Sequence, residues 1–499
     1  MGILSRLSKP FASWVIRDQT RWSMDAVNVQ RSVFQQLIRG GLNTLFGRDH
    51  DFASIHNFED FQQRVPIVDY EDIRNYIDRI VAGESDILWK GKPIYLAKTS
   101  GTTSGTKYIP ITKESIPNHI NSARNALLSY IQDTGNSHFL NGKLIFLSGS
   151  PVLNHDQAIP TGRLSGMVNH HVPGYLRTNQ MPSYQTNCIE DWEQKIDEII
   201  EETLQQDMTL ISGIPPWVQM YFDRIIAKTG KKIKDVFPNF SLMVHGGVNF
   251  GPYKAKLFDS IGAPVDAIET YPASEGFIAY QDSQTQEGLL LLLDSGIFFE
   301  FIPDDQYFQE KPDRLTIGDV EIGVNYVLIL SNNAGLWAYS LGDIVKFVSK
   351  NPYRLVVTGR IKHFISAFGE HVIGEDVEKA MKLTLEMHPE TELVEFTVAP
   401  QVTPKQGLPL HQWYIEFSHS PRDLTTFEKG LNLQLQKLNS YYDDLIAGKI
   451  LKCLEVVSLR KEAFRDYMKS QGKLGGQNKV PRLSNDRKIV DHLDQYKLS

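Results

Sequence analysis

The chain has few cysteines, no long apolar run and no excess of charge of one sign. Only Cys188 and Cys453 are cysteines among its 499 residues. Two are too few for a disulfide framework or a cysteine metal site, and this scarcity favours a reducing compartment. The formal net charge is −7, from 52 basic and 59 acidic residues, and no dense block of lysine and arginine occurs. We therefore expect neither nucleic acid nor a membrane as a partner.

The N-terminus lacks the features of a targeting segment. Its apolar stretch, residues 10–16, is followed by Arg17 and Asp18 and is far too short to span a bilayer. The myristoylation pattern fails because Arg6 stands where serine or threonine is needed. No G-x-S-x-G segment or Ser-His-Asp order occurs, which disfavours hydrolysis. We expect a cytoplasmic protein.

Apolar and aromatic residues are plentiful, which indicates a globular protein. The hydrophobic fraction is 41%, with 25 Phe and 20 Tyr, and the length allows two or three domains. Helical apolar spacing dominates the first ninety residues, including one helix over residues 25–47 that is expected to stop at Gly47. Short strand-like runs then alternate with helical stretches, one of which starts at Pro215 or Pro216. This alternation predicts an α/β core with a mostly parallel sheet.

The pattern changes near residue 360, after the strand-like run "YRLVVTGR". Helical and strand-like segments are then expected, in chain order, over residues 375–387, 392–400, 411–419 and 424–438. The first of these helices has Val377, Ala380, Met381, Thr384 and Leu385 on one face, and the second has Leu424, Phe427, Leu431, Leu435 and Leu438. We therefore predict a large N-terminal α/β domain with mixed sheets (residues 1–358) and a small mobile α+β domain (residues 359–499).

The segment "KTSGTTSGTKYIPIT", residues 98–112, concentrates hydroxyl side chains and glycine before a lysine. It is not the familiar G-x-x-x-x-G-K-[ST] phosphate loop, because Gly101 and Gly105 are one residue too close and a strand follows. One interpretation is an ordinary surface turn between two strands. The other is a hairpin loop that wraps phosphate oxygens, because glycine lets the backbone approach closely and successive amides form an anion-binding nest. Lys107 would add a positive charge.

This loop resembles the phosphate loop of acyl-adenylate-forming enzymes, and further segments of that superfamily follow in order. They are "VHGGVNFG" (244–251), "YPASEGF" (271–277), "YSLGDIV" (339–345), "GR" (359–360) and "GQNKVPR" (476–482). With "FGRDHDFASI" and "VPIVDYEDIRNYIDRIVAGE", they make the chain similar to the auxin-responsive GH-three family of acyl acid amido synthetases. The shorter loop is closer to the bacterial branch of that family.

The resemblance implies a role for each matching residue. Lys107, Glu275 and Lys479 would be catalytic, with Glu275 also the Mg²⁺ ligand. ATP contacts would come from the hydroxyl-rich loop (Thr99, Ser100, Gly101, Thr102 and Thr103) and from the Gly-Gly loop beside the adenine (Gly246 and Gly247). The Y-x-x-[ST]-E segment would add Tyr271 and Ser274. Asp343 would bind the ribose, and Arg360 and His371 would contact ATP from the hinge region. Asp343 is expected at a strand–turn–strand junction. His371 departs from the family, which has a lysine there.

The implied reaction is ATP-dependent adenylation of an acyl acid, followed by transfer of the acyl group to an amino acid. An acid–thiol ligase that uses coenzyme A and a non-catalytic nucleotide-binding regulatory protein remain alternatives. Candidates for the acyl pocket are Arg124, Trp217, Met220 and His245. The sequence names neither the acid nor the acceptor, and it leaves the oligomeric state open between monomer and dimer.

Overall fold

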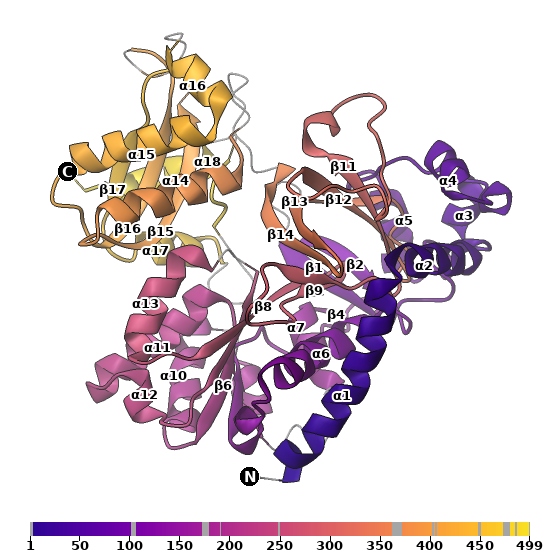
Figure 1. Ribbon diagram of the computed structural model, residues 1–499, viewed down its shortest axis with the longest axis horizontal. Helices are drawn as coiled ribbons and strands as arrows, with labels where there is room; N and C mark the ends of the chain where they lie inside the picture. Colours follow the sequence, from indigo (N-terminus) through magenta and orange to yellow (C-terminus); the bar gives the residue numbers. More distant parts are fainter. Residues whose placement is uncertain are drawn as a thin grey trace. The chain divides into compact units, whose positions relative to one another are not determined.

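The computed structural model describes residues 3–100, 106–171, 179–189, 191–247, 250–361, 372–401, 404, 407–447, 451–472, 480–484 and 487–498. Figure 1 shows the chain coloured along its sequence. It divides into two compact units, Met1–Gly247 with Ser260–Val357, and Val248–Asp259 with Thr358–Ser499. The large N-terminal domain was also predicted to bind ATP and the acyl acid, and the small C-terminal domain to move. Both statements stay predictions.

Helices α1 to α5 form the start of the chain, as predicted. They span Ile3–Met24, Ala26–Gly41, Leu45–Asp49, Phe58–Arg64 and Arg74–Val81. The single helix predicted up to Gly47 is wrong, because the chain breaks after α2 and Thr44 caps α3 by accepting a hydrogen bond from the Gly47 N–H. Gly47 is instead inside α3, where a Cβ would lie 2.1 Å from the Gly41 carbonyl oxygen. Among the described residues, no helix is both long and apolar enough to cross a bilayer.

The parallel part of the main sheet carries the predicted α/β pattern. Five strands lie in the order β5-β3-β6-β7-β8, and each neighbouring pair is parallel. Their bounds are Lys143–Phe146 (β3), Gln180–Met181 (β5), Met208–Ser212 (β6), Leu242–Gly246 (β7) and Asp266–Ala273 (β8). Helix α10 (Trp192–Thr203) precedes β6, and α11 (Pro215–Thr229) follows it, with Pro215 at its first position as predicted.

The same sheet continues on the far side of β8, where β9 pairs with it in the antiparallel direction. The order there is β9-β10-β14-β13-β12-β11. The bounds are Gly276–Tyr280 (β9), Leu289–Leu291 (β10), Ile297–Pro303 (β11), Asn325–Asn332 (β12), Tyr339–Lys350 (β13) and Tyr353–Arg360 (β14). The prediction of mixed sheets is therefore confirmed. The prediction of a mostly parallel sheet is wrong, because within the described residues of this sheet only the strands from β5 to β8 are parallel, and five further pairs, β8-β9, β9-β10, β10-β14, β13-β12 and β12-β11, are antiparallel.

A separate small sheet holds the hydroxyl-rich segment. Strands β1 (Tyr95–Ser100) and β2 (Thr106–Ile111) are antiparallel, and β4 (Thr161–Gly162) pairs with β1 in parallel. Helix α6 (Ile116–Thr134) begins soon after β2 and packs against α1 in a shared apolar cluster. The hairpin of β1 and β2 is therefore followed by a helix that packs against α1.

The C-terminal residues form the predicted α+β unit. Its sheet is β15-β16-β17, with β15 at Glu392–Gln401, β16 at Leu410–His419 and β17 at Glu455–Leu459. Its helices are α14 (Gly374–Met387), α15 (Leu424–Leu438), α16 (Ser440–Ala447), α17 (Ala463–Ser470) and α18 (Lys488–Leu493). The strand β17 and the last three helices were not predicted.

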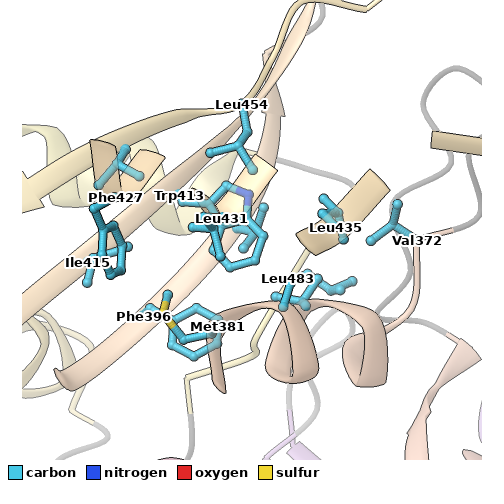
Figure 2. Packing of buried hydrophobic residues seen from close by; sticks show 14 of the residues in the cluster. Val372, Met381, Phe396, Trp413, Ile415, Phe427, Leu431, Leu435, Leu454 and Leu483 are labelled. Carbon is cyan, nitrogen blue, oxygen red and sulfur yellow. The ribbon is translucent and has the colours of Figure 1, made fainter. Parts of the chain in front are cut away.

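The core of this unit joins α14 and α15 to the sheet (Figure 2). The face predicted for α14 is confirmed, because Val377, Ala380, Met381 and Thr384 are buried. On α15 the prediction holds for Phe427, Leu431 and Leu435, whereas Leu424 is 36% exposed. Leu424 is the first residue of the helix, where the chain has not yet turned toward the core.

Part of helix α13 (Gly251–Ile261) also clusters with this unit. The Tyr253 hydroxyl donates to Glu395 Oε2 at 3.0 Å, and Arg482 Nη2 donates to the Tyr253 hydroxyl oxygen at 2.5 Å. Arg482 also forms ion pairs with Glu378, at 3.2 Å, and with Glu395. The opposite charges of these largely buried side chains compensate one another. An isolated buried arginine would lack this compensation.

Candidate active site

Strands β1 and β2 flank the hydroxyl-rich loop as a hairpin, which confirms the expected local structure. Thr99 lies opposite Lys107, and Ser100 lies opposite Thr106. Gly101, Thr102 and Thr103 lie outside the described residues, as do the side chains of Thr99 and Ser100. Their contacts with phosphate stay predictions.

Lys107 is held against an aromatic ring that the sequence did not single out. Its Nζ lies 5.2 Å from the centroid of the Tyr70 ring, within the range of a cation–π interaction. Tyr70 is 3% exposed, and its hydroxyl oxygen accepts the Tyr108 N–H at 3.0 Å. Burial raises the pKa of Tyr70, so this hydroxyl stays protonated. The only sequence signal was its place in the family-like segment "VPIVDYEDI".

The turn between β8 and β9 presents Ser274 and Glu275, both half-buried. The Glu275 carbonyl oxygen accepts a hydrogen bond from Asn332 Nδ2 at 2.6 Å. On the other side of the turn, the Phe277 N–H donates to Asn118 Oδ1 at 2.7 Å, and Asn118 Nδ2 donates to the Phe277 carbonyl oxygen at 3.1 Å. Two buried asparagines thus fix the backbone at Glu275 and at Phe277, two residues later.

The Glu275 carboxylate also acts electrostatically on Tyr339 of β13. Burial raises the pKa of Tyr339 far above its usual value. The negative charge of Glu275 raises this pKa further, and Asp69 and Tyr70 add smaller effects in the same direction. Val68 and Tyr339 are bridge partners, so residues 68–70 run beside β13. Tyr70 therefore lies beside β13, which carries Tyr339, and beside β2, which carries Lys107. Sequence reasoning assigned no role to either tyrosine.

The Gly-Gly segment lies at the carboxyl end of β7. A Cβ at Gly246 would lie 2.4 Å from the Thr270 carbonyl oxygen, so only glycine fits between β7 and β8. Gly247 has a φ of +82°, a conformation that also favours glycine. His245 precedes them, is 3% exposed, and its carbonyl oxygen accepts a hydrogen bond from Thr270 Oγ1 at 3.0 Å.

Asp343 was predicted at a strand–turn–strand junction, but it lies inside β13. Ser340 pairs with Ile329 and Ile344 pairs with Val327, so residues 341–343 form a bulge opposite a single residue of β12. Gly342 has a φ of +76° within this bulge. Bulges re-aim side chains, and here Asp343 is 2% exposed. Its Oδ2 accepts the Tyr271 hydroxyl at 2.5 Å.

The four candidates for the acyl pocket lie on three elements, α6, α11 and β7. Trp217 is 6% exposed and Met220 is half-buried in the first turns of α11, which starts at the carboxyl end of β6. His245 is close to the carboxyl end of the neighbouring strand β7, and ligands of open α/β sheets bind at such ends. Arg124 instead contacts Asn125 Oδ1 at 2.9 Å and lies over the Phe11 ring of α1 at 5.7 Å.

The structure does not test the roles of three further predicted residues. Arg360 is exposed at the end of β14 and belongs to the C-terminal unit. His371 and Lys479 lie outside the described residues. Their roles stay predictions.

Comparison with known proteins identifies the family. The sequence matches the GH3 family N-terminal domain over residues 15–168, the GH3 family central domain over 290–360 and the GH3 family C-terminal domain over 375–488. The chain belongs to the GH3 family. The family resemblance seen in the sequence is thereby confirmed.

Curated relatives match over nearly the whole chain at low identity. The indole-3-acetic acid-amido synthetase GH3.3 of Arabidopsis thaliana is 22% identical over 94% of this chain and 91% of its own. The jasmonoyl–L-amino acid synthetase GH3.5 of Oryza sativa subsp. japonica is also 22% identical, over 92% and 93%.

Solved structures share the fold of this GH3 protein. The GH3.15 acyl acid amido synthetase superposes with a TM-score of 0.81 at 17% identity, covering 98% of this chain and 96% of that one. The 2-hydroxyisobutyryl-CoA ligase, solved with an acyl-AMP in the postadenylation state, has a TM-score of 0.61 at 14% identity, covering 94% and 91%. The predicted fold class is therefore confirmed.

Proposed function

We propose that this GH3 protein is a ligase, an ATP-dependent acyl acid amido synthetase that forms AMP. In the first half-reaction an acyl acid carboxylate attacks the α-phosphate of ATP. A carboxylate–phosphorus bond forms, the bond to the β-phosphate oxygen breaks, and pyrophosphate leaves. In the second, the amine of an amino acid attacks the acyl carbonyl, an amide forms and AMP leaves. The observation that carries this proposal is the match to the three GH3 family domains, and the contact of Lys107 with the Tyr70 ring at the hydroxyl-rich hairpin supports it.

The first half-reaction joins two anions, so it needs positive charge and aligned donors. The backbone and hydroxyl groups of Thr99 to Thr103 bind the phosphates, and Lys107 contributes a cation. Asp343 accepts hydrogen bonds from the ribose hydroxyls. Gly246 and Gly247 let the backbone approach the adenine, on which the Tyr271 ring stacks.

The residues present fit Mg²⁺ bound together with nucleotide phosphates. Mg²⁺ in such sites takes one or two carboxylates, with phosphate oxygens and water completing its shell. Glu275 supplies one carboxylate from a turn whose backbone is held by hydrogen bonds at Glu275 and at Phe277. Within the described parts of the chain, no group of three or more His, Cys, Asp or Glu side chains could form an all-protein site. When bound, Mg²⁺ supplies charge neutralisation on the triphosphate.

The small C-terminal domain supplies the remaining groups. Lys479 stabilises the anionic transition state of adenylation, and rotation about a hinge near Arg360 then withdraws it for the second half-reaction. His371 occupies the place of the lysine that the family has after the hinge. As a protonated imidazole it can contact phosphate.

The acyl acid is aromatic or aliphatic, because the named relatives act on indole-3-acetic acid and on jasmonate. Trp217, Met220 and His245 line its pocket near the carboxyl ends of β6 and β7. Arg124 could reach the acid only if it left its contact with Phe11. The partners are small molecules, and we place the reaction in the cytoplasm because of the low cysteine content.

One experiment tests this proposal against both alternatives. Purified protein is incubated with ATP, Mg²⁺ and panels of aromatic, indole and fatty acids, with either an amino-acid mixture or coenzyme A. We expect acid-dependent pyrophosphate release and an amide product detected by mass spectrometry. A thioester without an amide would establish the acid–thiol ligase, whose fold is shared. No pyrophosphate with any acid would indicate a non-catalytic nucleotide-binding protein.

A further inference from the structure

Tyr271 and Asp343 form a side-chain contact between strands that are not neighbours. Tyr271 is in β8, Asp343 is in the bulge of β13, and β9, β10 and β14 lie between these two strands in the sheet order. The Tyr271 hydroxyl nevertheless donates to Asp343 Oδ2 at 2.5 Å. Asp343 is one of the residues, 341–343, that leave the regular register in this bulge.

Both side chains of this pair are buried. Tyr271 is 9% exposed and Asp343 is 2% exposed. A buried carboxylate needs hydrogen-bond donors, and a bond to an ionised acceptor is stronger than one between neutral groups. The hydroxyl therefore restrains the rotation of the carboxylate and engages one of its two oxygens.

We infer that the Tyr271 hydroxyl is a positioning group that orients Asp343 toward the ribose, so that the two residues recognise the sugar as one unit. This inference rests on the proposed function, in which Asp343 accepts the ribose hydroxyls. It adds to Tyr271 a role that is separate from stacking of its ring on adenine. Loss of the hydroxyl alone should let the carboxylate rotate, and the protein should then distinguish ATP less well from nucleotides that lack a ribose hydroxyl.

The test uses Tyr271→Phe, which keeps the ring and removes only the hydroxyl. Binding of ATP, 2′-deoxy-ATP and 3′-deoxy-ATP is measured by calorimetry for the wild-type protein, Tyr271→Phe and Asp343→Asn. For the wild type we expect at least one deoxynucleotide to bind about 10-fold or more weakly than ATP. In Tyr271→Phe, ATP should bind about 3- to 10-fold more weakly, and its preference over that deoxynucleotide should shrink to about threefold or less.

Tyr130 offers a matched control in the same unit. Its hydroxyl donates to Asp266 Oδ2, also at 2.5 Å, and it has no place in the proposed site. Tyr130→Phe therefore loses the same kind of hydrogen bond. Tyr130→Phe should change thermal stability without changing the preference for ATP. If the effect of Tyr271→Phe were merely structural, that variant would also leave the preference unchanged.

The outcomes separate this inference from the proposed function. If Tyr271→Phe keeps the wild-type preference while Asp343→Asn loses it, the positioning role is refuted and the ribose role of Asp343 stands. If Asp343→Asn keeps the preference, or the wild type has none, Asp343 does not read the ribose and both roles fail. Because the readout is binding, it remains decisive even if the wild type releases no pyrophosphate, a result that would refute the proposed enzymatic activity alone.

Discussion

The side-chain amide of Asn118 forms two hydrogen bonds with the backbone of Phe277. Its Oδ1 accepts the Phe277 N–H at 2.7 Å, and its Nδ2 donates to the Phe277 carbonyl oxygen at 3.1 Å. Asn118 is in the first turn of α6, which follows the hydroxyl-rich hairpin. Phe277 comes two residues after Glu275. One side chain therefore links α6, the helix after the hairpin, to the strand that follows the proposed metal-binding turn.

Asn118→Leu should lower both stability and the rate of adenylation. The change leaves a buried N–H and a buried carbonyl without their partner, at a cost of about 1–3 kcal/mol each. We expect the free energy of unfolding to fall by about 2–4 kcal/mol, measured by urea denaturation. Acid-dependent pyrophosphate release should slow even at temperatures where the variant is fully folded. Wild-type rates in a destabilised variant would show that the coupling has no effect on the site.

Glu275→Gln should raise the Mg²⁺ concentration needed for half-maximal pyrophosphate release by about tenfold, because an amide is a poorer Mg²⁺ ligand than a carboxylate. Glu71→Gln is the matched control. It makes the same charge change at a residue that also acts electrostatically on Tyr339, but it is exposed and pairs with Arg74 at 3.1 Å. The same Mg²⁺ dependence in both variants would remove Glu275 from the metal site.

Lys479→Ala should slow formation of the acyl-adenylate by about a hundredfold or more, the scale of a lost transition-state donor. Amide formation from a separately supplied acyl-adenylate should remain close to normal, because the lysine is assigned to the first half-reaction. Lys469→Ala, in α17, is the control for loss of a lysine from the C-terminal unit. Equal losses in both half-reactions would contradict a model with two domain positions.

His119 should make stability depend on pH. It is 4% exposed, its Nδ1 has no hydrogen-bond partner among the described residues, and burial lowers its pKa to about 4. The unfolded chain, with a histidine pKa of about 6.5, binds more protons between these values. The free energy of unfolding should therefore rise with pH from about 4 to 6.5.

The variant His119→Leu isolates this contribution. The stability difference between wild type and variant should change by on the order of 3 kcal/mol between pH 7 and 4, with the wild type losing more as the pH falls. Chemical denaturation across that range measures it. Parallel pH profiles for the two proteins would show that His119 does not titrate with a lowered pKa.

Local patterns in the sequence predicted the elements that carry the site. The hairpin around residues 101–105 and the Gly-Gly end of β7 follow from short runs of hydroxyl, glycine and β-branched residues. The C-terminal strands β15 and β16 were placed within a residue of their observed ends, because both segments are rich in β-branched and aromatic residues. These features depend on residues that are close in sequence.

Features that depend on distant residues were not predicted. Asn118 looks like any polar residue of a helix, and only the partner 159 positions away gives it a role. The bulge at Asp343 arises from its register against β12, which the sequence of β13 alone does not contain. Tyr70 and Tyr339 likewise acquire their roles only where separate segments meet.

The membership of Val248–Asp259 in the C-terminal unit has a consequence for protein engineering. The chain passes between the two units at three places, after Gly247, Asp259 and Val357. An exchange of C-terminal domains between family members at residue 357 alone would separate Tyr253 from Glu395 and Arg482, its buried hydrogen-bond partners. A chimera that keeps this packing has to carry residues 248–259 together with everything after 357, as two inserts rather than one.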